Sequence, residues 1–185
     1  MKAVLLALLL ISQPQKFQIS GGIGYSGYTY SGSDWGSNSD KGVTFRVSFD
    51  YWDRDFLAFG IDSGYQYFGD ERIIRNIYFI PNFKIGTTNL GKNKLFIQAG
   101  IGYDVVGRDD LLGGGINDES SLAFYLGIGF MRNFDKFHTG AVFNYLYVPG
   151  VYFCGGDCPA DIHFPTISIF FGFGSVETFV SSSRK

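Results

Sequence analysis

The sequence predicts an all-β fold, an eight-stranded antiparallel up-and-down transmembrane β-barrel. Eight segments alternate a bulky apolar residue with a small or polar one, and residues 43–51, Val-Thr-Phe-Arg-Val-Ser-Phe-Asp-Tyr, are the clearest of them. A period of two is typical of a strand with two different faces. The face between the bulky residues is rich in Gly, Ala and Ser and poor in charge, so it would make a poor water-facing exterior. A barrel with its apolar face toward lipid accounts for both observations.

Turn residues separate the alternating segments. We expect the first strand to run from Phe17 to Tyr30 and the second from Val43 to Trp52, with a Gly/Ser/Asn-rich loop between them. The other strands are expected at about residues 57–68, 73–85, 95–105, 122–131, 137–147 and 166–174. Pro81 falls inside the fourth strand, and because proline lacks an N–H we expect a β-bulge there.

The connections between the expected strands differ in length. We assign the connections after the first, third, fifth and seventh strands as loops, and all of these except the third are long. The connections after the second, fourth and sixth strands are assigned as turns, and the one after the fourth is the longest of them. Bacterial outer-membrane barrels keep short turns in the periplasm and longer loops outside. An even strand count then leaves both termini in the periplasm. Each expected strand has about ten residues, which is enough to cross a bilayer at a tilt of ~45°.

The chain opens with Met1-Lys2 and an apolar run from Ala3 to Ile11. A positive charge before a run of this length indicates a secretory signal peptide. We assign the signal peptide to residues 1–15, although no Ala-x-Ala cleavage site follows the run; a short membrane anchor or a buried helix is the alternative. The barrel then covers residues 16–174, and residues 175–185 form a short C-terminal tail.

The composition narrows the function classes. Charged residues make up 17% of the chain, below the roughly 25% of soluble domains. The net charge of −2 gives no basic surface for nucleic acid. No internal stretch approaches the ~20 continuous apolar residues of a transmembrane helix. These values fit a membrane barrel and argue against a nucleic-acid-binding protein.

Alternation alone leaves open which face is outward, because a soluble lipocalin-like carrier also alternates. Eight strands leave an interior only just wide enough for side chains, and the large apolar residues of this chain would overfill it. We therefore place them toward lipid, with Arg75 and Arg132 at strand ends, where a long cation can reach the headgroups. The expected aromatic girdles at the membrane interfaces are formed by Tyr28, Tyr30, Tyr51, Trp52, Tyr65, Tyr67, Tyr145 and Tyr147.

Polar and charged residues on the other face form an expected interior network. Its members are Arg46, Asp50, Asp62, Gln66, Asn76, Lys84, Gln98, Asp104, Tyr125 and Asn144. Folding the second and third strands about Arg54 places Arg46 directly opposite Asp62, and opposed charges across a ladder attract. A charge inside a narrow barrel must be paired. We interpret the network as a plug that fixes the register; a gate that opens a small conduit is the alternative.

Cys154 and Cys158 enclose Gly155-Gly156-Asp157 in the last long loop. An oxidising compartment favours a disulfide between them, and the two glycines allow the tight ring. Two free thiols are the first alternative. A metal site is the second, with His163 as the nearby candidate ligand, but metal sites need more ligands than this. We expect no metal.

Catalytic residues are not expected. Ester hydrolysis needs a nucleophile, a base and an orienting acid within reach of one another. His138 lies near a periplasmic turn, and His163 lies beside Asp161 without a convincing serine partner, so we interpret His163 as a solvated loop residue. The acidic outer-loop residues do not follow calcium-loop spacing and are interpreted as solvated; they are Asp34, Asp40, Asp109, Asp110, Asp118 and Glu119.

The strand number, the period of two, the leader and the loop asymmetry over Phe17 to Phe173 resemble the small eight-stranded outer-membrane proteins of the OmpA/OmpX type. The resemblance implies a place in the bacterial outer membrane, with lipid, lipopolysaccharide and the barrel assembly machinery as partners and no cofactor. The chain departs from the usual pattern after Phe173, because such proteins commonly end on an aromatic residue.

This resemblance points to a structural or surface-binding, adhesin-like role, in which the extracellular loops contact a host or matrix ligand. A narrow gated channel is the alternative function. An enzyme acting on outer-membrane lipid is a third.

Overall fold

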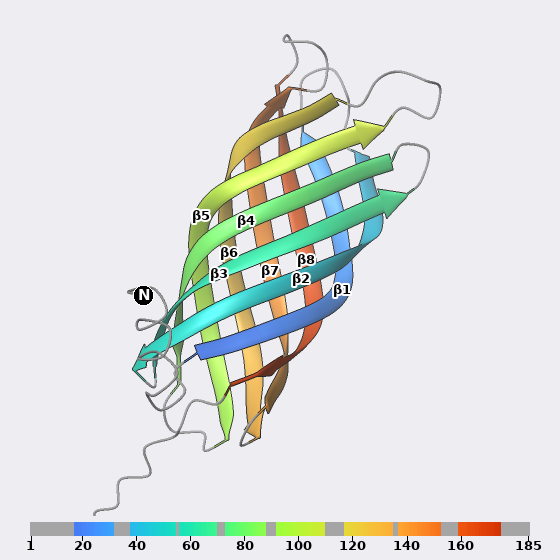
Figure 1. Ribbon diagram of the computed structural model, residues 1–185. Helices are drawn as coiled ribbons and strands as arrows, with labels where there is room; N and C mark the ends of the chain where they lie inside the picture. Colours follow the sequence, from blue (N-terminus) through green and yellow to red (C-terminus); the bar gives the residue numbers. More distant parts are fainter. Residues whose placement is uncertain are drawn as a thin grey trace, which may run out of the picture.

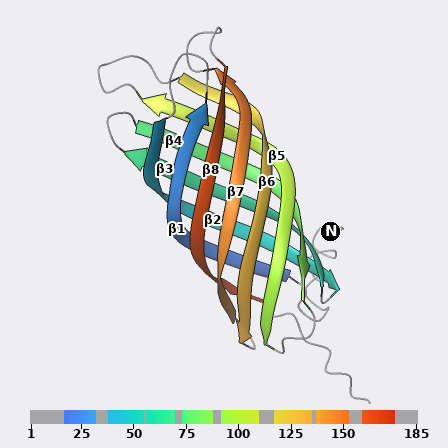
Figure 2. The ribbon, with the colours of Figure 1, turned by 180° about the vertical axis from the view of Figure 1, so that it is seen from behind.

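The computed structural model is a closed barrel of eight antiparallel strands, which confirms the predicted fold class (Figure 1, Figure 2). The structure describes residues 17–31, 38–54, 56–69, 73–87, 92–109, 117–134, 137–152 and 159–174. Each strand pairs with the next along the chain, and β1 closes the barrel by pairing with β8. The strands are β1 (Phe17–Ser31), β2 (Asn38–Arg54), β3 (Leu57–Gly69), β4 (Ile73–Gly86), β5 (Asn93–Asp109), β6 (Asn117–Phe134), β7 (Phe137–Tyr152) and β8 (Pro159–Phe173).

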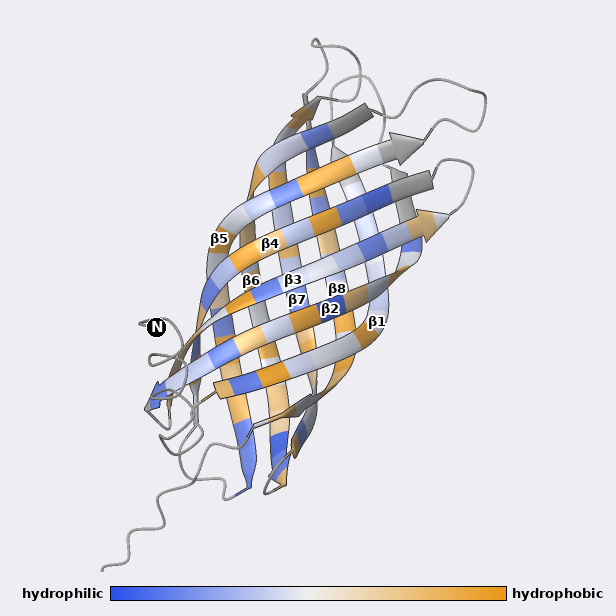
Figure 3. Cartoon of the chain, in the orientation of Figure 1, coloured by the Kyte–Doolittle hydropathy of each residue, from blue (hydrophilic) through white to orange (hydrophobic). Residues whose placement is uncertain are grey.

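The two faces of the barrel wall differ as the alternation predicts. In β2, Phe45 is 51% exposed on the outside, whereas the next residue, Arg46, is 5% exposed on the inside. Every strand carries large apolar side chains that are exposed on its outer face. Figure 3 shows hydrophobic and hydrophilic residues following one another along the strands. Among the described residues, no helix is long and apolar enough to cross a membrane.

The strands are longer than the apolar pattern indicates. They contain 13 to 18 residues rather than about ten. β2 begins at Asn38 instead of Val43, and β6 begins at Asn117 instead of Leu122. Backbone pairing does not require apolar side chains, so the ladders continue beyond the apolar band into polar segments that resemble loops by composition. The described strands therefore extend past the thickness of a bilayer core, for which roughly 9–11 tilted residues suffice.

The expected β-bulge at Pro81 is wrong. The register of β4 is continuous on both sides, and Pro81 pairs with Ile61 of β3. On the β5 side the pairing skips Ile80 and Pro81, because a proline has no N–H to donate to that ladder. The strand absorbs the proline by losing contacts rather than by adding a residue. The register shifts lie elsewhere, between Trp52 and Arg54 of β2 and between Val148 and Val151 of β7.

Candidate functional site in the barrel interior

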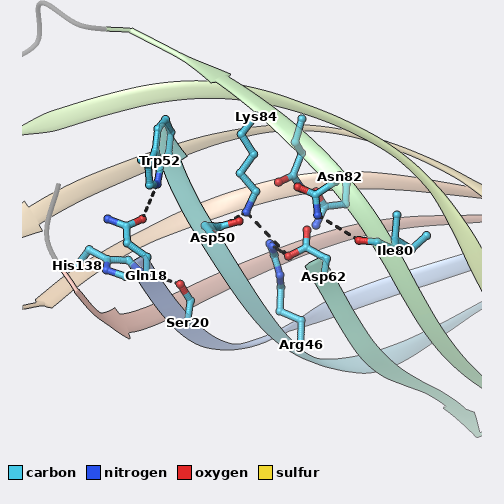
Figure 4. Close-up of polar contacts among 12 residues, drawn as sticks. Gln18, Ser20, Arg46, Asp50, Trp52, Asp62, Ile80, Asn82, Lys84 and His138 are labelled. Carbon is cyan, nitrogen blue, oxygen red and sulfur yellow. Dashed lines mark hydrogen bonds and ion pairs between the residues drawn. The ribbon is translucent and has the colours of Figure 1, made fainter. Parts of the chain in front are cut away.

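Four charged side chains from three neighbouring strands meet inside the barrel, and we call them the charged layer: Arg46 and Asp50 of β2, Asp62 of β3 and Lys84 of β4. Arg46 Nη2 lies 2.8 Å from Asp62 Oδ1, and Lys84 Nζ lies 2.7 Å from Asp50 Oδ2 (Figure 4). Lys84 Nζ is also 3.9 Å from Asp62 Oδ1. The positive charges of the two cations thus balance the negative charges of the two carboxylates in a region closed to solvent.

The Arg46–Asp62 contact exists, but the register that predicted it is wrong. Arg46 pairs with Gly64, and Asp62 pairs with Ser48, so the two charges lie diagonally rather than opposite each other. The turn lies further along the chain than Arg54, because Arg54 itself pairs with Leu57, and the pairing along the rest of the two strands is therefore displaced by two residues from the predicted one. The long arginine side chain spans the diagonal, which a short side chain would not reach.

A hydrogen-bond chain extends the charged layer across the bore. The Tyr125 hydroxyl of β6 donates to Asp62 Oδ2 at 2.9 Å. Gln98 Nε2 of β5 donates to the Tyr125 oxygen at 2.8 Å and to Asn144 Oδ1 of β7 at 2.6 Å. The network therefore connects strands from β2 to β7 and fixes side chains that could otherwise move independently.

A second polar group lies nearer the loops. Gln66 Oε1 accepts a hydrogen bond from Asn76 Nδ2 at 2.8 Å, and Gln66 Nε2 donates to Thr166 at 2.9 Å and to Ser26 at 3.1 Å. Asp104 is also buried, with Asn76 and the backbone of Val105 as its polar neighbours, although neither contact has the geometry of a standard hydrogen bond. The structure thus places every predicted interior residue inside the barrel.

Two apolar clusters flank the charged layer. The turn-side cluster lies near the strand ends that the short turns connect; it contains Trp52, Ala58, Phe96, Met131, Val142 and Phe170. The loop-side cluster fills the opposite half; it contains Tyr28, Phe68, Tyr78, Ile80, Val106, Ala123, Tyr125, Leu146, Val148, Val151, Ile162 and Phe164. A cavity of about 10 Å³ remains beside the charged layer, which is room for roughly one water molecule.

Two predicted girdle residues are interior residues instead. Trp52 is 2% exposed, and its Nε1 donates to Gln18 Oε1 at 2.9 Å (Figure 4), while Lys94 Nζ lies 3.8 Å from the centre of the indole ring. Tyr28 is 7% exposed and packs edge-on against Phe68. Proximity to a strand end does not determine whether a side chain points inward or outward. Successive side chains along a strand alternate between the two faces, so the residue's place in that alternation determines its direction. Trp52 follows Asp50 by two residues, so the sequence itself contained the correct signal.

The other predicted girdle residues divide as follows. Tyr65, Tyr67 and Tyr145 are exposed on the outer face. Tyr51 is partly exposed beside Phe17, with ring centres 5.0 Å apart, and Tyr147 is partly exposed next to His163. The side chain of Tyr30 lies outside the described residues.

His138 is fully buried and forms a contact that the sequence argument missed. Its Nε2 lies 2.7 Å from Ser20 Oγ (Figure 4), and its Nδ1 lies 3.1 Å from the Gly174 carbonyl oxygen. Ser20 is in β1 and His138 in β7, so the pair meets only because β8 closes the barrel between them. A buried serine and histidine with a backbone carbonyl as third partner lack the acid and the substrate access of a hydrolytic triad.

His163 lies in β8 and not in a loop, so that part of its interpretation is wrong, although its side chain is partly exposed. Its Nδ1 is 2.6 Å from the Tyr145 hydroxyl, and its ring stacks on Tyr147 with centres 5.0 Å apart. The Tyr147 hydroxyl donates to Asp161 at 3.0 Å. These residues form an ordered group on the outer wall at the loop end of β7 and β8.

Several predicted features lie outside the described residues. They are the signal peptide at 1–15, the tail at 175–185, Asp34, Asp110, Cys154 and Cys158. The disulfide between the two cysteines therefore stays a prediction.

Comparison with known proteins identifies the fold. No protein-family model matches the sequence, and no curated protein matches it. Among solved structures, Neisserial surface protein A is similar, with a TM-score of 0.70 at 16% identity over 86% of this chain and 97% of that one. The outer membrane protein OprG from Pseudomonas aeruginosa is similar, with a TM-score of 0.54 at 14% identity, covering 87% and 97% of the two chains. Ail, the attachment invasion locus protein of Yersinia pestis, gives a TM-score of 0.52 at 14% identity over 86% and 99%. The chain has the fold of the small eight-stranded β-barrels of bacterial outer membranes.

Proposed function

We propose that the protein is a non-conducting barrel of the bacterial outer membrane that presents its loop-side surface for binding, in the manner of an adhesin. The closed interior is the observation that carries this proposal. A conduit would have to pass the turn-side cluster, the charged layer and the loop-side cluster, and both clusters are made of fully or nearly fully buried side chains. Eight-stranded barrels in general are filled by side chains rather than by water.

The charged layer supports the same function. Breaking a buried ion pair costs about 3–5 kcal/mol, because an uncompensated charge is left behind. Opening a path would require Arg46 to leave Asp62 and Lys84 to leave Asp50, two such losses at once. A structural plug therefore fits these residues better than a gate.

Electrical recording tests this part of the proposal. Purified protein is inserted into a planar lipid bilayer, and a porin with an open channel is inserted in parallel as the positive control. We expect no current steps from this protein at voltages where the porin conducts. Reproducible steps of fixed size would replace the proposal with the narrow-channel alternative.

The loop-side surface fits a binding role. The similar structures include one named as a surface protein and one named as an attachment invasion locus protein, which supports the proposal without assigning a ligand. The outer ends of the strands form a rigid frame, and loops on such a frame can vary without affecting the barrel.

Loop replacement tests the binding role. Each connection at the loop end (residues 32–37, 70–72, 110–116 and 153–158) is replaced in turn by a Gly-Ser linker of equal length. Cells that express each variant are tested for adhesion to immobilised fibronectin, to laminin and to epithelial monolayers. We expect at least one replacement to abolish adhesion while the amount of folded barrel is unchanged. Equal adhesion by all variants and by cells without the protein would exclude the adhesin role.

A further inference from the structure

The ladder between β6 and β7 ends before the two strands do. Its last pair toward the loop end is Phe124 with Tyr147, although both strands continue past it. On its other side β6 stays paired as far as Asn117, which lies opposite Arg108 of β5, and Figure 1 shows the two strands running side by side there. Among the described residues, the first part of β6 (residues 117–123) therefore has a strand partner on one side only. We call this segment the β6 edge.

Pro149 and Gly150 of β7 explain why the ladder ends. Continuing the register places Pro149 opposite Leu122, and proline has no N–H for the next bond of the ladder. Gly150 then takes a φ of +66°, and its N–H donates to Asp161 Oδ1 of β8 at 3.0 Å. The Ser121 hydroxyl still donates to the Pro149 carbonyl oxygen at 2.8 Å, but a side-chain contact does not continue the ladder. β7 thus turns its backbone toward β8, and the β6 edge has no neighbour on that side.

The direction of the backbone groups along β6 follows from one hydrogen bond. The Asn133 N–H donates to the Lys92 carbonyl oxygen at 2.8 Å, and the register between β5 and β6 is continuous from there to the loop end. Residues of an antiparallel strand direct their N–H and C=O groups alternately to its two sides, so the odd-numbered residues of β6 face β5. The backbone groups of Asp118, Ser120 and Leu122 therefore face the open side. They form a row of main-chain donors and acceptors.

The β6 edge extends beyond the apolar band of the barrel wall. Residues 117–121 are Asn-Asp-Glu-Ser-Ser, whereas the large exposed apolar side chains of β6 begin at Leu122. Lipid-exposed sheet edges do not occur in the hydrocarbon of a bilayer, because main-chain groups would have no partner there. Outside the hydrocarbon, an unpaired edge is a template for pairing with another chain. The β6 edge therefore belongs to the loop-side surface.

Main-chain geometry and charge specify the occupant of the β6 edge. A row of N–H and C=O groups at alternate residues is matched by the backbone of another extended segment, which is how a peptide adds a strand to a sheet. The β6 edge contains the acidic residues Asp118 and Glu119 and no basic residue. Lysine or arginine on the added segment would complement these carboxylates, whereas a second copy of the same edge would bring like charges together.

We propose that the β6 edge binds an extended basic segment of a partner protein as an added β-strand. This inference rests on the binding role proposed above and names the class of partner for one part of the loop-side surface. Main-chain hydrogen bonds supply the affinity of such a site, so the partner is selected by its extended conformation and its positive charge.

A synthetic peptide tests the proposal. The probe is fluorescein-labelled Lys-Val-Lys-Val-Lys-Val-Lys, and its binding to the full-length protein in phosphatidylcholine nanodiscs is measured by fluorescence anisotropy, with empty nanodiscs as the blank. A second peptide carries an N-methyl group on every amide, which keeps the charge but removes the main-chain donors. A third has glutamate in place of every lysine. We expect saturable binding of the first peptide and about tenfold weaker binding of the other two.

A matched pair of variants at Ser120 locates the binding. Ser120→Pro removes an N–H on the open side without removing a bond to β5, and proline is tolerated at edge positions of this kind. Ser120→Ala keeps the N–H and is the control. We expect the proline variant to bind the first peptide about tenfold more weakly and the alanine variant to bind it as the wild type does. The double variant Asp118→Asn/Glu119→Gln should also weaken binding, and circular dichroism verifies the barrel in each case.

Three outcomes would overturn the proposal. The first is equal binding of the unmodified and the N-methylated peptides, which would indicate adsorption by charge alone. The second is equal binding by Ser120→Pro and Ser120→Ala or, if the proline variant does not fold, by the wild type and Asp118→Asn/Glu119→Gln. The third is a dimer in analytical ultracentrifugation that Ser120→Pro dissociates, which would identify a second copy of the chain as the occupant.

Peptide binding and cell adhesion together separate this inference from the proposed function. A protein that mediates adhesion but does not bind the peptide would overturn the inference and keep the adhesin role. Peptide binding by a protein that mediates no adhesion would support the β6 edge as a binding site and exclude the adhesin role.

Discussion

Arg46 illustrates how one residue supports the barrel interior. Its guanidinium lies 2.8 Å from Asp62, and both side chains are almost completely buried. Arg46→Ala leaves the Asp62 carboxylate with Lys84 at 3.9 Å and the Tyr125 hydroxyl as its remaining partners. We expect the free energy of unfolding to fall by about 3–5 kcal/mol, the cost of breaking a buried ion pair. Urea unfolding of the refolded barrel in detergent or vesicles measures this loss.

Two further variants separate the ion pair from the lost arginine volume. Arg46→Ala combined with Asp62→Ala should be less destabilised than the sum of the two single variants, because no carboxylate is then left unpaired. Arg132→Ala removes an exposed arginine from β6 and should change the free energy of unfolding by about 0.5 kcal/mol or less. An unchanged unfolding midpoint for Arg46→Ala would contradict the role of the pair.

At the scale of the strand, interior glycines and aromatic residues act as cross-strand pairs. Gly129 of β6 pairs with Phe96 of β5, and the phenyl ring occupies the space that a side chain at Gly129 would need. Gly64 of β3 pairs with Tyr78 of β4 in the same way. An aromatic ring laid over a glycine on the next strand is a known way to stabilise a curved sheet. These pairs let large rings fit inside a barrel this narrow.

The Gly129–Phe96 pair gives a prediction for the strand scale. Gly129→Ala would push its Cβ into the Phe96 ring, so we expect a loss of about 1–3 kcal/mol through overpacking. Gly21→Ala is the matched control, because a Cβ there meets nothing within 4 Å. It should be neutral or stabilise by up to ~1 kcal/mol, since alanine orders a strand at lower entropic cost than glycine. Chemical unfolding of both variants tests the pair, and equal stabilities would refute it.

For the molecule as a whole, alternation predicted which residues face inward because a strand has only two faces. It placed Arg46, Asp62 and Lys84 inside and Phe45 outside, and it would have placed Trp52 inside had its position been counted from Asp50. Register and strand length depend on backbone geometry, which side-chain hydropathy does not determine. The Ser20–His138 contact needs the closure of β1 on β8, so no local pattern could predict it.

The topology of the whole barrel gives the last prediction. The β7–β8 connection lies at the loop end and contains Cys154 and Cys158, whereas Thr87 follows β4 at the turn end. If the loop end faces outward, a membrane-impermeant maleimide should label Cys154 and Cys158 on intact cells after reduction. The same reagent should not label Thr87→Cys, in a chain with both native cysteines replaced by serine, until the outer membrane is opened.

Labelling without reductant examines the predicted disulfide in the same experiment. A Cys154–Cys158 bridge leaves no thiolate to react, so the signal should appear only after reduction. Two free thiols on unreduced cells would exclude the bridge but preserve the topology. Labelling of Thr87→Cys on intact cells, in the chain whose native cysteines are replaced by serine, would show that the barrel has the opposite orientation in the membrane, and the binding surface would then have to be sought at the turns.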